Sequence, residues 1–165
     1  MNVAFQRNVG SFLRAAAAFG ASASLVAGSG ADGAPVNGLT IDRNQFVPLA
    51  LSAFVVLQMD VTGLGEDESV EWAITAEDSA NGTDWDALDI GPPDGVGATV
   101  VTEEGVAVVT RKAQLGAARR YVRFLATPTF SATGTDAATI IGGTVIVAGF
   151  DELPADPYVE PAPSS

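Results

Sequence analysis

The sequence predicts an all-β protein: a single antiparallel β-sandwich of immunoglobulin-like or jelly-roll-like type. From residue 39 to residue 150, short runs of β-branched, aromatic and other apolar residues alternate with polar ones at a period of two. Segments rich in Gly, Pro, Asn and Asp, which favour turns, separate these runs. The region shows no amphipathic helical pattern, so the crossover helices of a parallel sheet are not expected.

Six segments are expected to be strands. They cover residues 51–61, 70–77, 99–101, 106–110, 121–127 and 139–148. In the second segment Trp72 lies on the apolar side of the alternation, which places it in the core. Glu103, Glu104 and Gly105 separate the third segment from the fourth, and we expect them to form the turn of a hairpin.

The two ends of the chain differ from this central region. Residues 1–38 are expected to form an N-terminal arm and linker, residues 39–150 the β-sandwich domain, and residues 151–165 an extended, Pro-rich tail. The arm carries two basic residues in its first 31 positions and no acidic one, whereas the rest of the chain is strongly acidic.

The arm also carries an apolar stripe. With Ala16, its large members recur at intervals of three and four residues, so the arm is expected to be extended or partly helical. They are Phe5, Val9, Phe12 and Phe19. Because the Gly-, Ala- and Ser-rich residues behind them offer little apolar surface, we expect the stripe to be buried against a partner protein. The alternative is a cleaved secretory signal peptide, with Arg7 and Arg14 in its basic part.

The composition excludes most catalytic chemistry. The 165 residues include no Cys and no His, which rules out thiolate nucleophiles, Cys-ligated metals and the Ser-His-Asp triad. The 20 acidic and 8 basic residues give a net charge of −12, the wrong sign for binding nucleic acid. The longest uncharged stretch is rich in Ala and Gly, so no membrane span is expected. The sequence therefore predicts no enzyme, no catalytic residue, no cofactor, and no nucleic-acid or membrane partner.

Residues 28–33 match the dinucleotide-binding pattern G-x-G-x-x-G letter for letter. That motif binds a pyrophosphate where a strand precedes it and a helix N-terminus follows it. Here Pro35 and Gly38 stand where a helix would have to continue. The match is expected of a Gly-rich linker and predicts no nucleotide site.

Acidic and amide side chains crowd residues 77–89, and such oxygen ligands suit Ca²⁺. The EF-hand pattern is missing, so the alternative is a solvated hairpin whose Asp and Asn side chains cap turns. No metal site is predicted. Trp72 and Trp85 flank this hairpin, and together they could stack on a sugar, although Trp72 is expected in the core.

Residues 111–123 hold five of the eight basic side chains. Arg119, Arg120 and Arg123 are therefore the candidates for contact with an acidic partner surface. The alternative is intramolecular: these Arg side chains pair with Glu and Asp of neighbouring strands. The sequence leaves both alternatives open.

Three segments resemble small β-sandwich virion proteins of tailed bacteriophages. Residues 77–85, EDSANGTDW, are similar to their acidic hairpin; residues 118–123, ARRYVR, followed by Pro128 and by residues 133–139, TGTDAAT, resemble their closing hairpin; and residues 149–154, GFDELP, resemble their ending. The resemblance covers about residues 70–154.

The resemblance implies a capsid cement or decoration protein without catalytic residues. Its partners would be the major capsid protein and further copies of itself, as a homotrimer. It would be made in the host bacterial cytoplasm, consistent with a chain that needs no disulfides, and would act in the virion. The alternatives are a phage tail or neck component and a secreted or surface carbohydrate-binding β-sandwich module.

Overall fold

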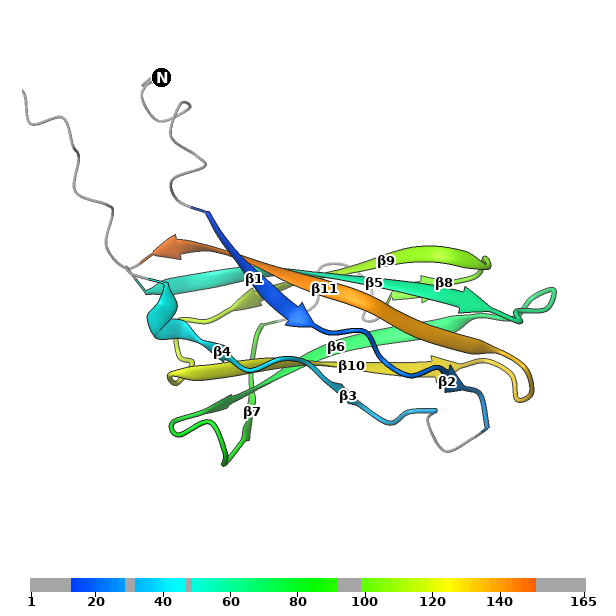
Figure 1. Ribbon diagram of the computed structural model, residues 1–165, viewed down its shortest axis with the longest axis horizontal. Helices are drawn as coiled ribbons and strands as arrows, with labels where there is room; N and C mark the ends of the chain where they lie inside the picture. Colours follow the sequence, from blue (N-terminus) through cyan, green and yellow to red (C-terminus); the bar gives the residue numbers. More distant parts are fainter. Residues whose placement is uncertain (1–12, 29–31, 47–48, 92–98, 151–165) are drawn as a thin grey trace, which may run out of the picture.

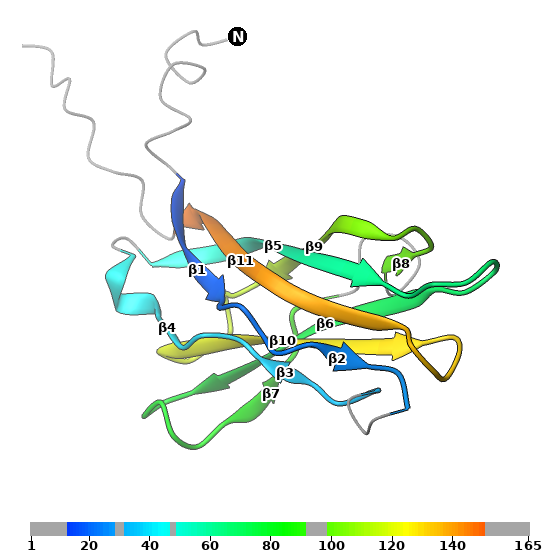
Figure 2. The ribbon, with the colours of Figure 1, turned by 45° about the vertical axis from the view of Figure 1, so that its right-hand side comes forward.

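The computed structural model describes residues 13–28, 32–46, 49–91 and 99–150, with side chains up to Ala148 (Figure 1). Two antiparallel sheets pack face to face, which confirms the predicted β-sandwich. Figures 1 and 2 show the two layers from two directions, with β11 and β5 in one layer and β10 and β6 in the other. Residues 1–12 of the predicted arm and residues 151–165, the predicted tail, lie outside the described residues.

The first sheet has the order β1-β11-β5-β9, with β2 paired to another part of β11. Its strands are β1 (Arg14–Phe19), β2 (Leu25–Val26), β5 (Ala50–Thr62), β9 (Gly105–Gln114) and β11 (Ala137–Phe150). The long central strands β5 and β11 correspond to the segments predicted at 51–61 and 139–148. A bulge between Ile140 and Gly142 shifts their register once.

The second sheet has the order β3-β10-β6-β7, with β4 also paired to β10 and β8 also paired to β6. Its strands are β3 (Val36–Asn37), β4 (Ile41–Asp42), β6 (Val70–Ser79), β7 (Asp86–Leu88), β8 (Thr99–Val101) and β10 (Tyr121–Phe130). A short 3-10 helix, η2 (Arg43–Gln45), follows β4.

The core lies between the two sheets and is built by alternate residues of each strand. In β5 the inward residues Val55, Leu57, Met59 and Val61 are fully buried, and the residues between them are not. Trp72 of β6 is 1% exposed, so its predicted place in the core is confirmed. This alternation explains why the period of two in the sequence predicts the sandwich.

The predicted hairpin around residues 103–105 is wrong. β8 pairs with β6 in the second sheet, whereas β9 pairs with β5 in the first, so this turn carries the chain from one sheet to the other. A contact from another part of the molecule holds the turn, because the backbone N–H of Gly63 donates to Oε1 of Glu104. Such a connection has the same local turn chemistry as a hairpin, and only the long-range pairing separates the two.

Residues 14–19 form a strand, so the helical alternative for this part of the arm is wrong and the extended one holds. β1 pairs with β11 from Arg14 to Phe19. Ala18 and Phe19 are buried in the core, with Phe19 4% exposed. The described part of the predicted arm thus adds β1, β2 and β3 to the two sheets of the sandwich.

The chain between β3 and β4 ties the two sheets together along one side. The N–H of Gly38 donates to the carbonyl of Phe124 in β10, and the N–H of Leu39 donates to the carbonyl of Ala18 in β1. A Cβ atom at residue 38 would lie 2.5 Å from the Ala18 carbonyl oxygen and 2.6 Å from that of Phe124. Only glycine fits where the backbone passes this close to strands of both sheets.

Candidate docking surface

The outer face of the first sheet carries little charge: among the outward residues of β5 and β9, Lys112 and Asp60 are the charged ones. Its residues form rows across the strands: Ala15, Ile146, Phe54 and Lys112 in one row, and Ala17, Thr144, Val56 and Thr110 in the next. A third row continues through Ala148, Ser52 and Gln114. In these three rows Lys112 is the one charged residue, although the whole chain carries 28 charged side chains, 8 basic and 20 acidic. We call these rows, together with Leu13 and Val108, the apolar face.

Large side chains on this face are exposed to solvent. Phe54 is 36% exposed and Val108 of β9 is 52% exposed. Val106, which is 72% exposed, lies beyond this face and is the cross-strand partner of Asp60. Single exposed apolar residues are ordinary on protein surfaces, but large ones exposed on neighbouring strands of a face with little charge indicate an interaction site. The apolar face is therefore a candidate docking surface.

The outer face of the second sheet has a different character. Its outward positions include Glu71, Thr75 and Glu77 on β6, and Arg123 and Thr129 on β10. Glu77 and Arg123 are direct cross-strand partners. A sheet face that meets water is expected to carry such charged and polar residues. The outer face of the second sheet is therefore ordinary, and the scarcity of charge is specific to the first sheet.

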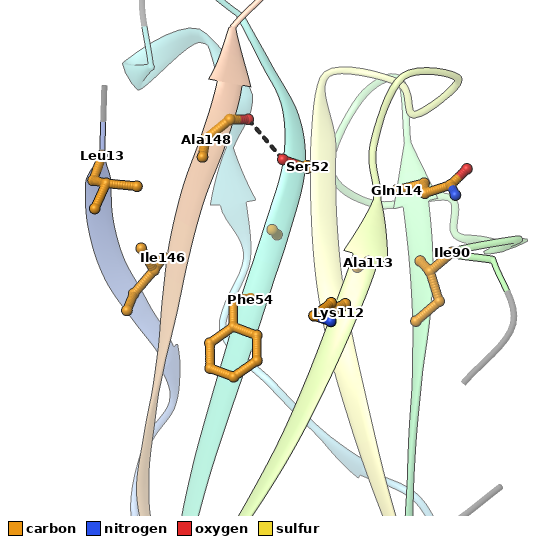
Figure 3. A pocket seen from close by; sticks show the side chains of 10 residues that line it. Leu13, Ser52, Phe54, Ile90, Lys112, Ala113, Gln114, Ile146 and Ala148 are labelled. Carbon is orange, nitrogen blue, oxygen red and sulfur yellow. Dashed lines mark hydrogen bonds between the residues drawn. The ribbon is translucent and has the colours of Figure 1, made fainter. Parts of the chain in front are cut away.

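A hollow of about 430 Å³ opens on the apolar face near Leu13 and the end of β11 (Figure 3). Phe54, Ile146 and Leu13 contribute large apolar side chains to its lining, and Ile90 lines it on the β9 side. The hydroxyl of Ser52 donates to the carbonyl of Ala148 at 3.0 Å, so its hydrogen is not available to a ligand. Lys112 and Gln114 bring the remaining polar groups.

The structure separates the predicted members of the arm stripe. Phe19 is buried in the sandwich itself, because β1 pairs with β11 and turns this side chain inward. Its side chain is therefore not at the surface where a partner would contact it. Phe5, Val9 and Phe12 lie outside the described residues, and their contact with a partner stays a prediction.

The three candidate Arg side chains each pair with an acidic residue of the same chain. Arg119 contacts Asp78 at 2.6 Å and Asp86 at 2.7 Å; Arg120 contacts Asp42 at 2.8 Å; Arg123 contacts Glu77 at 2.6 Å. These are the intramolecular pairs that the sequence allows as the alternative. A further contact of Arg119, Arg120 and Arg123 with a partner stays a prediction.

The guanidinium groups of two of these Arg residues lie against aromatic rings. The guanidinium of Arg123 is 4.3 Å from the ring centre of Trp85, and that of Arg120 is 4.7 Å from the ring centre of Tyr121. Because Trp85 is covered by Arg123 and Trp72 is buried, the two Trp rings do not form a shared exposed platform for a sugar.

The acidic segment 77–89 is a capped hairpin between β6 and β7. Oδ1 of Asn81 accepts from the N–H groups of Thr83 and Asp84, while its Nδ2 donates to Asp84 at 2.7 Å. Gly82 has a φ of +80°, which this tight turn requires. The predicted turn capping is thus confirmed. In the described part of the chain, no group of three or more acidic side chains is placed to hold a metal ion.

The remaining motif, residues 28–33, is followed by strand β3 and not by a helix. The helix N-terminus that a pyrophosphate would need does not follow it. Within the described ranges no helix has the length and apolar character to cross a membrane.

Two buried carboxyl groups have shifted pKa values in opposite directions. Burial acts to raise the pKa of Asp78, but hydrogen bonds from the side chain and backbone of Arg119 outweigh it and hold that pKa below its ordinary value. Burial raises the pKa of Asp136, which is 2% exposed, and the carboxylate of Glu68 raises it further. Asp78 is thus stabilised as an anion, whereas Asp136 is stabilised as the neutral acid.

No protein-family profile matches the chain, and no curated protein has a significantly similar sequence. The docking surface is therefore defined by its geometry alone. The sequence does not reveal this surface because residues 53–57 are apolar on both sides of the strand, which is typical of a strand buried on both faces. The near absence of charge on the outward residues of β5 and β11 is the signal that indicates it.

Proposed function

We propose that the protein is a non-enzymatic virion structural protein that binds and stabilises the phage capsid surface, as cement and decoration proteins do. The observation that carries the proposal is the apolar face on a chain with a net charge of −12. The capsid as partner rests on the resemblance of residues 77–85 and 118–139 to phage virion proteins.

The distribution of charge supports a docking role. The acidic side chains keep copies of the protein apart and soluble, whereas the apolar face offers a surface that gains free energy when it is covered. The strands that carry this face, β1, β11, β5 and β9, are rigidly paired, so little conformational entropy is lost on binding. These are the properties expected of a protein that binds in many copies to a fixed lattice.

The proposal is tested with particle binding by variants of Val108. This side chain lies on the apolar face, is 52% exposed, and is not part of the core. We expect Val108→Glu and Val108→Lys to bind capsids lacking the protein at least tenfold more weakly, because each buries an unpaired charge at the interface. Using both signs separates desolvation from simple attraction or repulsion.

Thr75→Glu is the matched control, since Thr75 lies outward on the second sheet. It should bind like the wild type in a co-sedimentation titration, and circular dichroism should show unchanged strand content in all three variants. Equal binding by both Val108 variants and the wild type would contradict docking through this face. A tail or neck component would bind purified tails or necks in the same assay and leave the capsids unbound.

A further inference from the structure

We propose that the hollow on the apolar face is the docking site for residues 1–12 of the same chain. The proposal concerns the free protein and does not depend on the capsid as partner. It assigns the hollow an occupant by three observations: the chemistry of the lining, the chemistry of the segment, and the point at which the segment joins the sandwich.

The hollow suits a mainly apolar occupant, although Lys112 and Gln114 also lie in its lining. Phe54, Ile146 and Leu13 line it, and the hydroxyl of Ser52 already donates to a backbone carbonyl. Its volume is about 430 Å³, and a dry apolar cavity of about 150 Å³ is enough to hold a benzene ring. The hollow therefore has room for more than one aromatic side chain.

Residues 1–12 have the matching composition. They include Phe5, Val9 and Phe12, and Arg7 is their one charged side chain. The C-terminal residues 151–165 also follow a strand that reaches this end of the sheet, but they carry Asp151, Glu152, Asp156 and Glu160 without a basic residue. The lining offers one cation, Lys112, against these four carboxylates, and burying the others among apolar side chains is costly, so the N-terminal segment is the better occupant.

The segment joins the sandwich at the rim of the hollow. Leu13, the residue that follows it, lines the hollow and is 43% exposed. The hollow extends from β1 to β9, three strand spacings or about 15 Å, whereas twelve extended residues reach about 40 Å. Gly10 offers a position at which the chain can reverse towards the sheet. Because the segment is tethered, its effective concentration at the hollow is about millimolar or higher.

A second copy of the protein is the less suitable occupant. The flat outer face of another sheet does not fill a concave hollow, and the association of two molecules costs translational and rotational entropy. A segment of the same chain pays only for the ordering of its own residues. The two occupants are distinguished by whether the contact forms within one chain or between chains.

The absence of Cys from the chain allows a direct cross-linking test. Asn8→Cys places a thiol next to Val9, and Gln114→Cys places one at the hollow, where Gln114 is an exposed lining residue. We expect a short bismaleimide to link this pair within one chain, at least tenfold more than it links Asn8→Cys to Thr75→Cys on the second sheet. A mixture of unlabelled and ¹⁵N-labelled protein, analysed by mass spectrometry, separates links within a chain from links between chains.

A second pair of variants tests the aromatic anchors. Phe5→Asp together with Phe12→Asp should reduce the link to Gln114→Cys to the level of the Thr75→Cys control, whereas Asn2→Asp should leave it unchanged. Urea unfolding of each variant shows that the sandwich is intact. Equal linking to the two sheets, or links only between chains, would overturn the proposal. So would a link that survives both Asp substitutions.

Discussion

Arg119 binds Asp78 through both its backbone and its guanidinium group. Its backbone N–H donates to Oδ2 of Asp78 at 2.7 Å and its Nε donates to Oδ1 at 2.9 Å. Its Nη2 donates to Oδ1 at 2.6 Å and to the backbone carbonyl of Asp78 at 2.8 Å. The carboxylate of Asp78 is nearly buried, with 8% of its side chain exposed. This pair connects the end of β6 with the chain just before β10.

Replacing Asp78 by Asn should destabilise the protein, and the loss should depend on pH. The lowered pKa of Asp78 means that the folded state favours the anion, so its contribution is present above the pKa of the unfolded chain and is lost as the pH falls through the folded pKa. We expect Asp78→Asn to cost about 2–3 kcal/mol at pH 7, and the cost to shrink as the pH falls through the folded pKa of Asp78. Urea unfolding of both proteins at several pH values measures the difference. An equal cost at both ends of the range would show that the charge of Asp78 does not matter.

Replacing Asp136 by Asn should have the opposite effect. The pKa of Asp136 is raised, so the stabilising form is the neutral acid, and its contribution is lost as the pH rises through the folded pKa. Above the pKa of the unfolded chain, folding must therefore either protonate Asp136 or bury its charge beside Glu68, and an Asn side chain removes that cost. We expect Asp136→Asn to unfold at a higher temperature than the wild type at pH 7, by a few degrees, and the gain to shrink towards pH 4.

Asp60→Asn is the control for this prediction, because Asp60 is exposed on β5. It removes the same charge from the chain without removing a buried one, so its melting temperature should stay close to that of the wild type. Differential scanning calorimetry at pH 7 and pH 4 measures all three proteins. A lower melting temperature for Asp136→Asn at pH 7 would indicate that the carboxylate of Asp136 is stabilised by its surroundings.

Exchanging the charges of Arg123 and Glu77 distinguishes the two roles predicted for Arg119, Arg120 and Arg123: ion pairs within the chain and contact with a partner. Arg123→Glu alone should cost about 1–2 kcal/mol, since it loses the ion pair and the contact with Trp85 and places two carboxylates together. Adding Glu77→Arg should restore much of this stability. Because the side chain of Arg123 is only 22% exposed, we expect the double variant to bind capsids like the wild type. A stable double variant with weakened binding would instead demonstrate the partner contact that the sequence predicts.

The strands that the sequence predicts are those whose two faces differ. In β6 the residues alternate between buried and exposed from Val70 to Ala76, and this pattern is visible in the sequence. β1 has the sequence RAAAAF, in which a run of Ala hides the alternation, and the spacing of Ala16 and Phe19 is that of a helix. Its pairing with β11, more than a hundred residues away, decides the strand, and no local pattern reports that pairing.

The candidate site depends on the same kind of long-range information. Arg119 pairs with Asp78, which lies 41 positions away in the chain. The sequence therefore indicates that these Arg side chains can form ion pairs within the chain, but not with which acidic residues. The apolar face needs the register of four strands before Phe54, Ile146 and Ala15 can be placed in one row. By contrast, the turn at Asn81 and Gly82 is set by local hydrogen bonds, and the sequence predicts it directly.

Two N-terminal truncations should differ sharply in stability, because β1 belongs to the sandwich. Deleting residues 2–12 leaves β1 intact, so we expect a loss of at most about 2 kcal/mol, the scale of burying one large apolar side chain.

Deleting residues 2–31 removes β1 and β2, exposes the side of β11 that β1 pairs with, and takes Phe19 out of the core. Phe19→Ala alone should cost about 3–5 kcal/mol. Since a domain of this kind has about 5–15 kcal/mol of stability in total, the longer truncation should be largely unfolded at 25 °C. Urea titrations that follow tryptophan fluorescence, to which the buried Trp72 contributes, measure all three variants. A cooperative transition at the wild-type midpoint for the protein without residues 2–31 would show that the sandwich holds together without β1, and that residues 13–31 serve a partner instead.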